Sequence, residues 1–313
     1  MRDGARGGWF SPTESISDDC RLSGGLLMLK ARVTYACLVE GLRDLGLRAG
    51  IGVVVHSSLS SFGHVEGGPG TVIRALMDIL TPEGTLLMPS FNHGAPFQRG
   101  RTGYYHPEET PTTNGAIPDC FWRLPDVARS LNPTHAFAAW GRNALRYTAH
   151  HHRTLAMGSA SPLGLLHQDD GHSLLLGVDY TSNTFHHVVE MSTQAPCLGQ
   201  RTEGYPVRLP GGRQVLGRTW GWRASSCPFT DRNRYADEMV KRQRVVMIGS
   251  CRAITFRLRD CYAVVSRILS EGKTGFPPCR GCAIRPRQVP QTLTSDWDVE
   301  RGRLRPDSEA LTY

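Results

Sequence analysis

Apolar residues recur along the chain at two spacings, which together predict a succession of helices and strands. Over residues 30–45 they recur every three or four positions, as in an amphipathic helix, and Gly46 and Gly50 end this pattern. The apolar run over residues 51–55 predicts a buried strand directly afterwards.

A glycine-rich loop separates this strand from a second helix and a second strand. The loop contains Gly67 and Gly68, apolar residues at helical spacing follow over residues 72–80, and a short strand is predicted at residues 85–88. Strand, loop, helix and strand in this order predict a right-handed crossover and a parallel strand pair. We therefore expect an α/β fold, with a mixed or largely parallel central sheet flanked by helices.

Later parts of the chain add further elements. Strands are expected at residues 173–178 and 245–248, and helices at about 184–191 and 256–269. The stretch 91–118 is rich in Gly, Pro, Thr, His and Tyr, and a connection of this length in a compact domain is usually functional.

The domain organisation follows from these patterns. We expect one large domain over residues 30–276, a loose N-terminal tail at residues 1–29, and a basic, Pro- and Arg-rich C-terminal tail at residues 277–313.

Composition limits the classes of partner. The 313 residues carry a formal net charge of +8, which favours an anionic partner. The Arg-rich C-terminal end lacks the interleaved aromatic residues of single-strand nucleic-acid binders, so we expect no nucleic acid. No apolar run approaches the roughly 20 residues needed to cross a bilayer, so we expect a cytoplasmic protein with no membrane contact.

Cysteines and histidines offer weak metal signals. Cys279 and Cys282 have the spacing of half a zinc site, but there is only one such pair, so we expect no metal and leave open whether the pair is oxidised. The triple His150, His151 and His152 is expected to be a solvated surface, because consecutive side chains diverge around a helix.

Two short segments carry candidate chemistry. His187 and Glu190 lie three residues apart and so share a face of the predicted helix, where a carboxylate can hold one imidazole nitrogen and leave the other to accept a proton. A solvated His–Glu pair is the alternative. His135 follows a proline-containing turn, and the sequence does not decide whether it binds substrate or hydrogen-bonds its own turn.

The glycine loop is a third candidate. A helix N-terminus beside exposed backbone amides suits phosphate, although an ordinary tight turn also explains the glycines. The chain has neither a G-x-x-x-x-G-K-[ST] loop nor a G-x-G-x-x-G motif, which argues against nucleotide hydrolysis and dinucleotide binding.

Several motifs, taken in order, closely resemble the aminoglycoside 3-N-acetyltransferase family. They occupy residues 54–59, 65–68, 82–86, 88–91, 129–135 and 158–162, followed by Asn183 and Thr184 with His187 and Glu190. The resemblance spans roughly residues 32 to 270. It is specific because separate motifs recur in the same order and at the same spacing.

The resemblance implies that residues 30–276 are an acetyltransferase domain with the α/β fold of that family, acetyl-coenzyme A as donor and a small-molecule amine as acceptor. It places the coenzyme at His56, Ser57, Ser58, Leu59, Ser60, Glu66, Gly67, Gly68, Ser90 and Phe91. It makes His187 the general base and Glu190 its partner. The reaction also needs a donor to the oxyanion, and either Thr184 or a backbone amide in the turn over residues 57–60 is expected to supply it. His135 and Asp179 are expected to bind the acceptor.

Departures from the family pattern concern the acceptor. Asn132, Ala136 and Thr181 stand where the family usually has a histidine, a small hydroxyl residue and an acidic residue. A net charge of +8 is also unexpected in a host for polycationic aminoglycosides. The alternative is therefore a biosynthetic N-acetyltransferase that acts on a different amine, with or without a phosphate group, and a basic nucleic-acid-binding protein is the weaker alternative. The oligomeric state, monomer or homodimer, is left open.

Overall fold

A computed structural model describes residues 32–192, 203–219, 232–270, 297–298 and 303–304 of the chain. The predicted N-terminal tail, most of the predicted C-terminal tail and the pair Cys279 and Cys282 lie outside these residues. Within the described part, no helix is long and apolar enough to cross a membrane.

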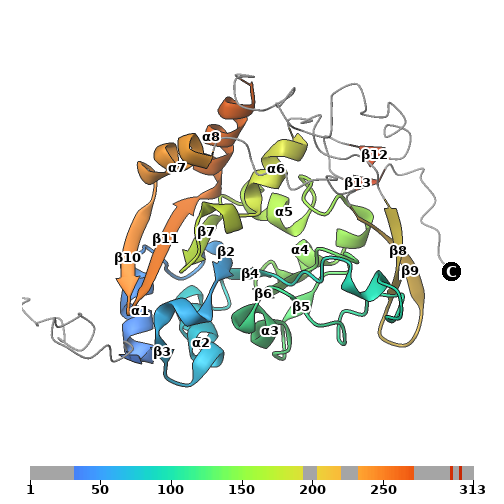
Figure 1. Cartoon of the computed structure of the whole chain (residues 1–313), viewed down its shortest axis with the longest axis horizontal. Coiled ribbons are helices and arrows are strands. Elements are labelled where there is room, and N and C mark those ends of the chain that lie inside the picture. The colour runs from blue at the N-terminus through green and yellow to red at the C-terminus, as the bar shows by residue number, and fades with distance from the viewer. Residues whose placement is uncertain (1–31, 193–202, 220–231, 271–296, 299–302, 305–313) are drawn as a thin grey trace, which may run out of the picture.

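The core is a seven-stranded mixed sheet. Its strands run from β10 on the left of Figure 1 to β5 near the centre. In spatial order they are β10 (Arg244–Ile248), β11 (Cys251–Arg257), β7 (His172–Leu176), β2 (Gly52–Ser57), β4 (Thr85–Pro89), β6 (Phe137–Gly141) and β5 (Ala128–Arg129). The predicted parallel pair is confirmed, since β2 lies parallel to β4 with Val53 opposite Leu86.

The mixed character of the sheet is also confirmed. β2 pairs in parallel with β7 on its other side, whereas the remaining neighbours are antiparallel. The carboxyl ends of β2, β4 and β7 therefore lie at one edge, where open α/β sheets commonly bind ligands.

Helices cover both faces, because the central strands bury side chains on each side. In β2, Val53 and Val55 pack in one apolar cluster and Val54 in the other. The first cluster includes α1 (Tyr35–Asp44), α2 (Gly68–Leu80) and α3 (Ala116–Trp122). The second includes α4 (Ala144–Thr148), α5 (Pro162–Gln168), α6 (Phe185–Ser192), α7 (Arg232–Val240) and α8 (Leu258–Ser270).

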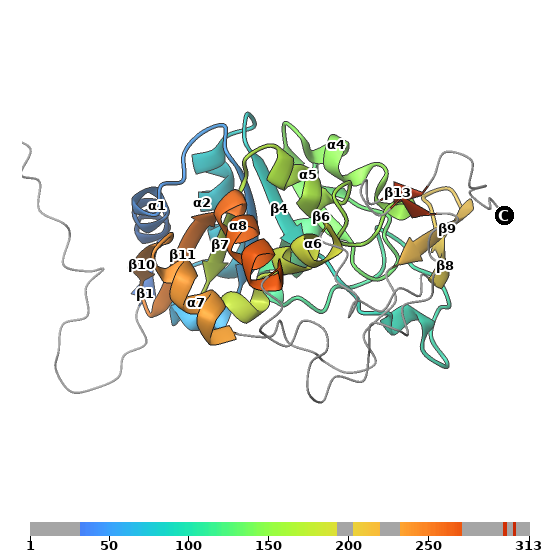
Figure 2. The same cartoon turned by 90° about the horizontal axis from the view of Figure 1, so that it is seen from above.

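Smaller pieces surround this framework. β1 (Arg32–Val33) pairs with β3 (His64–Val65), and β12 (Trp297–Asp298) pairs with β13 (Arg303–Leu304). The hairpin of β8 (Glu203–Arg208) and β9 (Gln214–Thr219) lies at the opposite end of the molecule from α1 (Figure 2). Short 3₁₀ turns occur at η2 (Leu59–Phe62), η3 (Ala95–Phe97), η4 (His151–Arg153) and η5 (Tyr180–Ser182).

Two predicted helices begin later than the sequence suggested. Thr34 caps α1, its hydroxyl accepting from the backbone N–H of Cys37 at 3.3 Å, and Arg32 and Val33 are in a strand instead. Phe256, predicted to start a helix, belongs to β11, and α8 starts at Leu258. In both places apolar residues of a strand happened to continue the helical spacing.

Candidate active site

Asn183 fixes the start of α6, the helix that carries His187. Its amide nitrogen donates to the Tyr235 hydroxyl at 2.9 Å and to the Cys261 sulfur at 3.5 Å. All three side chains are buried. Burial raises the pKa of the Cys261 thiol to about 12 and the pKa of Tyr235 well above its usual value, so both groups stay protonated and neutral. Residues from α7 and α8 thus hold the turn that precedes Thr184.

Thr184 and His56 bring two predicted site segments together. His56 lies near the carboxyl end of β2, and its Nε2 is 3.5 Å from the Thr184 hydroxyl. His56 is only 5% exposed, and burial lowers its pKa to about 4, so it is neutral at physiological pH. The backbone N–H of His187 donates to the Thr184 carbonyl at 3.1 Å, which places His187 one turn away.

His135 does hydrogen-bond its own turn. Its backbone N–H donates to Asn132 Oδ1 at 2.9 Å, and its Nδ1 is 2.8 Å from the Thr134 hydroxyl. The imidazole is 4% exposed, and its ring centroid is 5.0 Å from that of Phe91. Burial, with smaller contributions from His93, His187 and His151, lowers the pKa of His135 well below its usual value. His135 is therefore within electrostatic reach of His187, and binding of the acceptor there stays a prediction.

Asp179 and Glu190, the two carboxylates predicted for the site, lie in different elements. Asp179 is exposed, and its Oδ1 accepts from the backbone N–H of Thr181 at 2.8 Å, which caps η5. Glu190 lies on α6, almost one turn after His187. Contact of either carboxylate with substrate or with His187 stays a prediction.

The predicted coenzyme segment lies at the carboxyl ends of β2 and β4. Ser58 and Ser60 hydroxyls are 3.2 Å apart in the turn after β2. Ser57 Oγ and Ser90 Oγ are buried, and neither has a hydrogen-bond partner within the described part of the chain. Buried polar atoms are normally satisfied, so these two hydroxyls are suited to contact a ligand.

Gly67 and Gly68 connect β3 to α2. Their φ angles of 74° and 64° lie in the left-handed region that favours glycine. A side chain at Gly68 would project into open space as far as the described residues are concerned, since none of their atoms lies within 4 Å of its Cβ. Glu66, just before them, forms an ion pair with Arg32. Within the described part of the chain, the loop thus leaves open space beside Gly68 at the N-terminus of α2.

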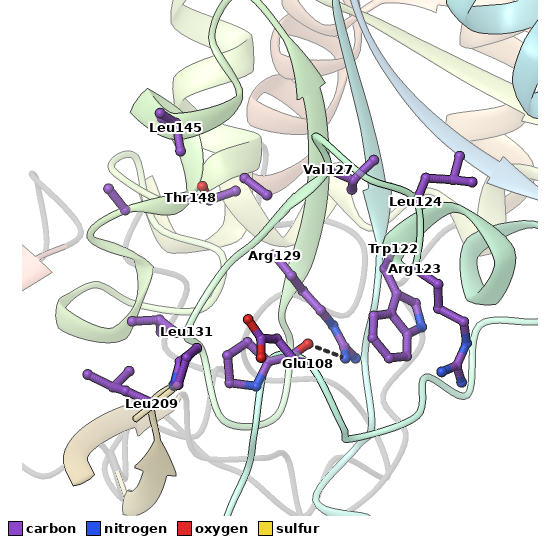
Figure 3. A pocket seen from close by; sticks show the side chains of 14 residues that line it. Glu108, Trp122, Arg123, Leu124, Val127, Arg129, Leu131, Leu145, Thr148 and Leu209 are labelled. Carbon is purple, nitrogen blue, oxygen red and sulfur yellow. Dashed lines mark hydrogen bonds between the residues drawn. The ribbon is translucent and has the colours of Figure 1, made fainter. Parts of the chain in front are cut away.

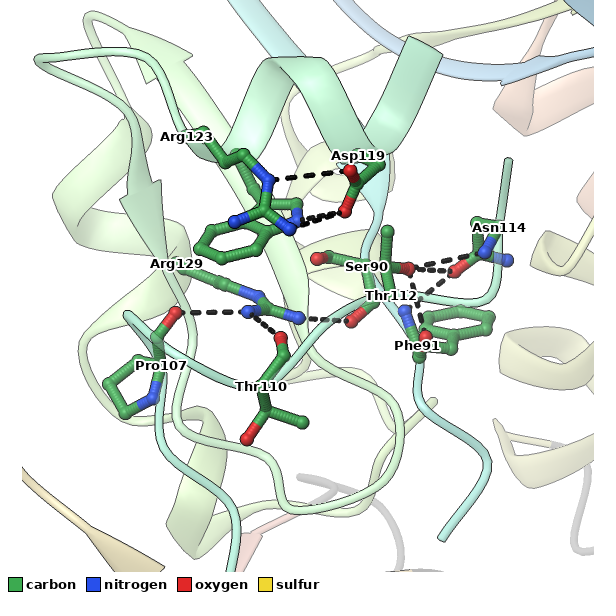
Figure 4. A network of polar contacts seen from close by, with 10 residues as sticks. Ser90, Phe91, Pro107, Thr110, Thr112, Asn114, Asp119, Arg123 and Arg129 are labelled. Carbon is green, nitrogen blue, oxygen red and sulfur yellow. Dashed lines mark hydrogen bonds and ion pairs between the residues drawn. The ribbon is translucent and has the colours of Figure 1, made fainter. Parts of the chain in front are cut away.

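Arg129 ties the long segment 91–118 to the sheet (Figure 4). Its guanidinium donates to the carbonyl oxygens of Pro107 at 3.0 Å, Thr110 at 2.5 Å and Ser90 at 3.2 Å. It also lies over the Trp122 ring, 4.2 Å from the centroid. One half-buried cation therefore holds the segment that follows β4 at Pro107 and Thr110.

His93 contacts two predicted site residues, and sequence reasoning did not single it out. Its ring centroid is 5.6 Å from those of Phe91 and His135, which come from different segments. Phe91 also packs edge to face with Phe137 at 5.2 Å. In the sequence His93 was only one polar residue of a long irregular stretch, and no motif marked it.

The prediction of a solvated histidine triple is wrong for His151. His151 is 1% exposed; its Nε2 donates to the Ala156 carbonyl at 3.0 Å, and its Nδ1 lies 2.8 Å from the Ser130 hydroxyl. Burial lowers its pKa to about 3. It is a neutral structural residue, and no group of three or more metal-ligating side chains occurs among the described residues.

A pocket of about 830 Å³ lies beside β5 (Figure 3). Its walls include Trp122, Arg129, Leu131, Leu145 and Leu209. None of the predicted site residues lines it, so it is distinct from the cluster around His187.

Comparisons with known proteins identify the family. The family model for aminoglycoside 3-N-acetyltransferases matches residues 54–270. The SPbeta prophage-derived aminoglycoside N(3')-acetyltransferase-like protein YokD of Bacillus subtilis (strain 168) is 36% identical over 198 residues, covering 58% of this chain and 72% of the relative. Aminoglycoside N(3)-acetyltransferase III of Pseudomonas aeruginosa is 36% identical over 172 residues, covering 50% and 63%.

Solved structures show the same fold. The crystal structure of aminoglycoside acetyltransferase AAC(3)-Xa superposes with a TM-score of 0.68 at 27% identity, covering 77% of this chain and 94% of that one. A histidine-to-alanine mutant of AAC(3)-IVa, in complex with a gentamicin, has a TM-score of 0.68 at 29% identity, covering 84% and 100%. The chain therefore belongs to the aminoglycoside 3-N-acetyltransferase family and is an acyltransferase with that family's α/β fold.

Proposed function

We propose that this chain is a cytoplasmic enzyme that transfers the acetyl group of acetyl-coenzyme A to the 3-amino group of an aminoglycoside antibiotic, and so confers resistance. The observation that carries the proposal is the position of His187. It lies on α6, and its backbone N–H donates to the carbonyl of Thr184. The Thr184 hydroxyl is in turn 3.5 Å from His56, at the edge of the sheet where β2, β4 and β7 end. Family membership supplies the reaction class.

The reaction needs a base, because an ammonium group has no lone pair with which to attack a thioester. In the proposed mechanism, the acceptor ammonium first releases one proton to solvent, and His187 removes a second proton from the neutral amine as the new N–C bond forms. The C–S bond then breaks, and the leaving sulfur takes the proton from His187. Glu190 orients the imidazole and offsets its charge, and Thr184 donates to the carbonyl oxygen as negative charge develops there.

Direct transfer is the proposed route. The segment from Asn183 to Glu190 contains no cysteine that could carry a covalent acetyl group. Two buried thiols of the described chain do not qualify either: Cys261 is held against Tyr235, and burial raises the pKa of Cys251 to about 11.

Features at the strand ends support a coenzyme site. The hydroxyls of Ser57 and Ser90 are buried without a partner in the described part of the chain, and they flank the ends of adjacent parallel strands. The N-terminus of the 13-residue α2 is suited to phosphate, with Gly67 and Gly68 allowing close approach of the main chain. When bound, the coenzyme supplies the acetyl group as an activated thioester.

Replacing Gly68 by valine is expected to weaken acetyl-coenzyme A binding at least about tenfold. The branched side chain would occupy the open space above the helix N-terminus and would strain a left-handed backbone. Calorimetric titration of coenzyme A measures this directly. Acceptor binding should change much less.

Gly50→Val is the matched control. Gly50 also has a positive φ, 83°, and open space at its Cβ, but it precedes β2 at the opposite end of the strand from His56. The two variants should lose similar stability, while only Gly68→Val should lose coenzyme affinity. If the two variants bound coenzyme A with equal affinity, the loop would be an ordinary turn. The coenzyme would then bind elsewhere than proposed.

A second acceptor class has one observation in its favour. The formal net charge of +8 suits an amine that bears phosphate better than a polycation. A scan of aminoglycosides, phosphorylated amines and simple amines with acetyl-coenzyme A, following release of the free thiol, distinguishes the two. Thiol release that depends on an aminoglycoside supports the main proposal, and release only with phosphorylated amines supports the second.

A further inference from the structure

His93 stands on a strained backbone. Its φ of 51° lies in the left-handed region, which residues other than glycine adopt at a cost. Residues held in such conformations cluster at functional sites, where the surrounding structure maintains them. Here Thr113 contributes to this support, since its hydroxyl is 2.7 Å from His93 Nδ1 and so orients the imidazole.

The ring of His93 packs against the rings of Phe91 and His135. Phe91 and His135 have their centroids 5.0 Å apart, and His93 contacts both rings nearly edge to face, at interplanar angles of 89° and 83°. Phe91 is 3% exposed and His135 is 4% exposed, whereas His93 is exposed. A molecule that approaches this group from solvent therefore meets His93 first.

One member of this group, His135, is close enough to the proposed base for His187 to contribute to the lowering of its pKa. The ring of His93 lies 5.6 Å from that of His135, measured between centroids. His93 comes from the loop after β4, His135 from the turn before β6, and His187 from α6. The ring contact of His93 with His135 thus joins two segments that are distant in the sequence.

We propose that His93 contacts the acceptor and helps to determine which amines the enzyme accepts. The inference rests on the proposed function, because it presumes that the acceptor approaches His187. It adds a residue that the family resemblance did not mark.

The chemistry of the imidazole suits a polyhydroxylated amine. Partial burial lowers the pKa of His93 below its usual value, so the ring is neutral at pH 7. A neutral imidazole can exchange hydrogen bonds with hydroxyl and amino groups without repelling a cationic acceptor. An alkylamine without hydroxyl groups would gain much less from the same contact.

The test is His93→Asn with gentamicin and with ethylamine as acceptors. Asparagine tolerates a left-handed backbone, so the loop is retained while the ring is removed. We expect KM for gentamicin to rise about tenfold, with kcat changed less than about twofold and KM for acetyl-coenzyme A unchanged. The kinetic constants for ethylamine should change little. His93→Gly, which adopts φ 51° without strain, is expected to behave in the same way.

Asp126→Asn is the matched control, because Asp126 is another exposed residue of positive φ, 65°, placed before β5 and outside the proposed site. It should leave all constants at parental values. Parental KM for gentamicin in both His93 variants would overturn the inference, as would equal losses for both acceptors together with a changed coenzyme KM. If the parent protein acetylates no amine at all, the proposed function fails and this inference fails with it.

Discussion

Replacing His187 by alanine is expected to lower turnover at least about 10²-fold and to leave the affinity for acetyl-coenzyme A nearly unchanged. The reason is that the proposed base acts on the acceptor amine, and general base catalysis contributes on the order of 10²- to 10⁴-fold. Steady-state kinetics of thiol release and calorimetric titration of coenzyme A measure the two quantities. His187 is partly exposed, so the substitution should not create a cavity in the core.

His150→Ala serves as the control for loss of a histidine as such. His150 is exposed and lies outside the cluster around His187, so its removal should leave kcat and KM at parental values. Near-normal turnover in His187→Ala would remove His187 from the mechanism. A loss of coenzyme affinity as large as the loss of turnover would show that the residue supports the donor site instead.

Replacing Arg129 by methionine is expected to destabilise the fold by on the order of 3 kcal/mol. Three carbonyl oxygens would lose their donor, and a buried acceptor left without a partner costs about 1–3 kcal/mol. Methionine keeps an apolar chain over the Trp122 ring, so the loss reports mainly the hydrogen bonds to Ser90, Pro107 and Thr110. Urea unfolding followed by circular dichroism gives the change in the free energy of unfolding.

Arg123→Met is the matched control. Arg123 lies over the same Trp122 ring, at 4.1 Å, but it is exposed and pairs with Asp119 on the helix surface. Exposed pairs of this kind contribute about 0–1 kcal/mol. A loss in Arg123→Met equal to that in Arg129→Met would assign the effect to the Trp122 ring and not to the three carbonyls.

The parallel centre of the sheet could be predicted because its strands are buried on both faces. Their continuous apolar runs, with the glycine loop and helix between β2 and β4, leave little ambiguity. The antiparallel strands were harder to find. β6 is short and rich in alanine, and β11 leads straight into α8, so its last apolar residues fitted a helix equally well.

The sequence predicted only those parts of the candidate site whose residues are close together in the chain. Thr184 directly precedes α6 and His187 lies in its first turn, and the motif around them pointed to both. The contact of His56 with Thr184 joins residues 128 positions apart, and the convergence of His93 with His135 depends on the course of a long loop. Burial of His151 likewise follows from its packing beside the sheet, against Phe137 and Ser130, and not from its sequence neighbours.

The central claim is that this chain acetylates an aminoglycoside on one amino group, with His187 as the base. The most direct test incubates the parent protein and His187→Ala with acetyl-coenzyme A and gentamicin, and identifies the product by mass spectrometry and by NMR assignment of the modified nitrogen. We expect a product that carries one acetyl group on the 3-amino nitrogen, formed by the parent at least about 10²-fold faster than by the variant. Hydrolysis of the thioester without an acetylated product, or equal rates for the two proteins, would contradict the account.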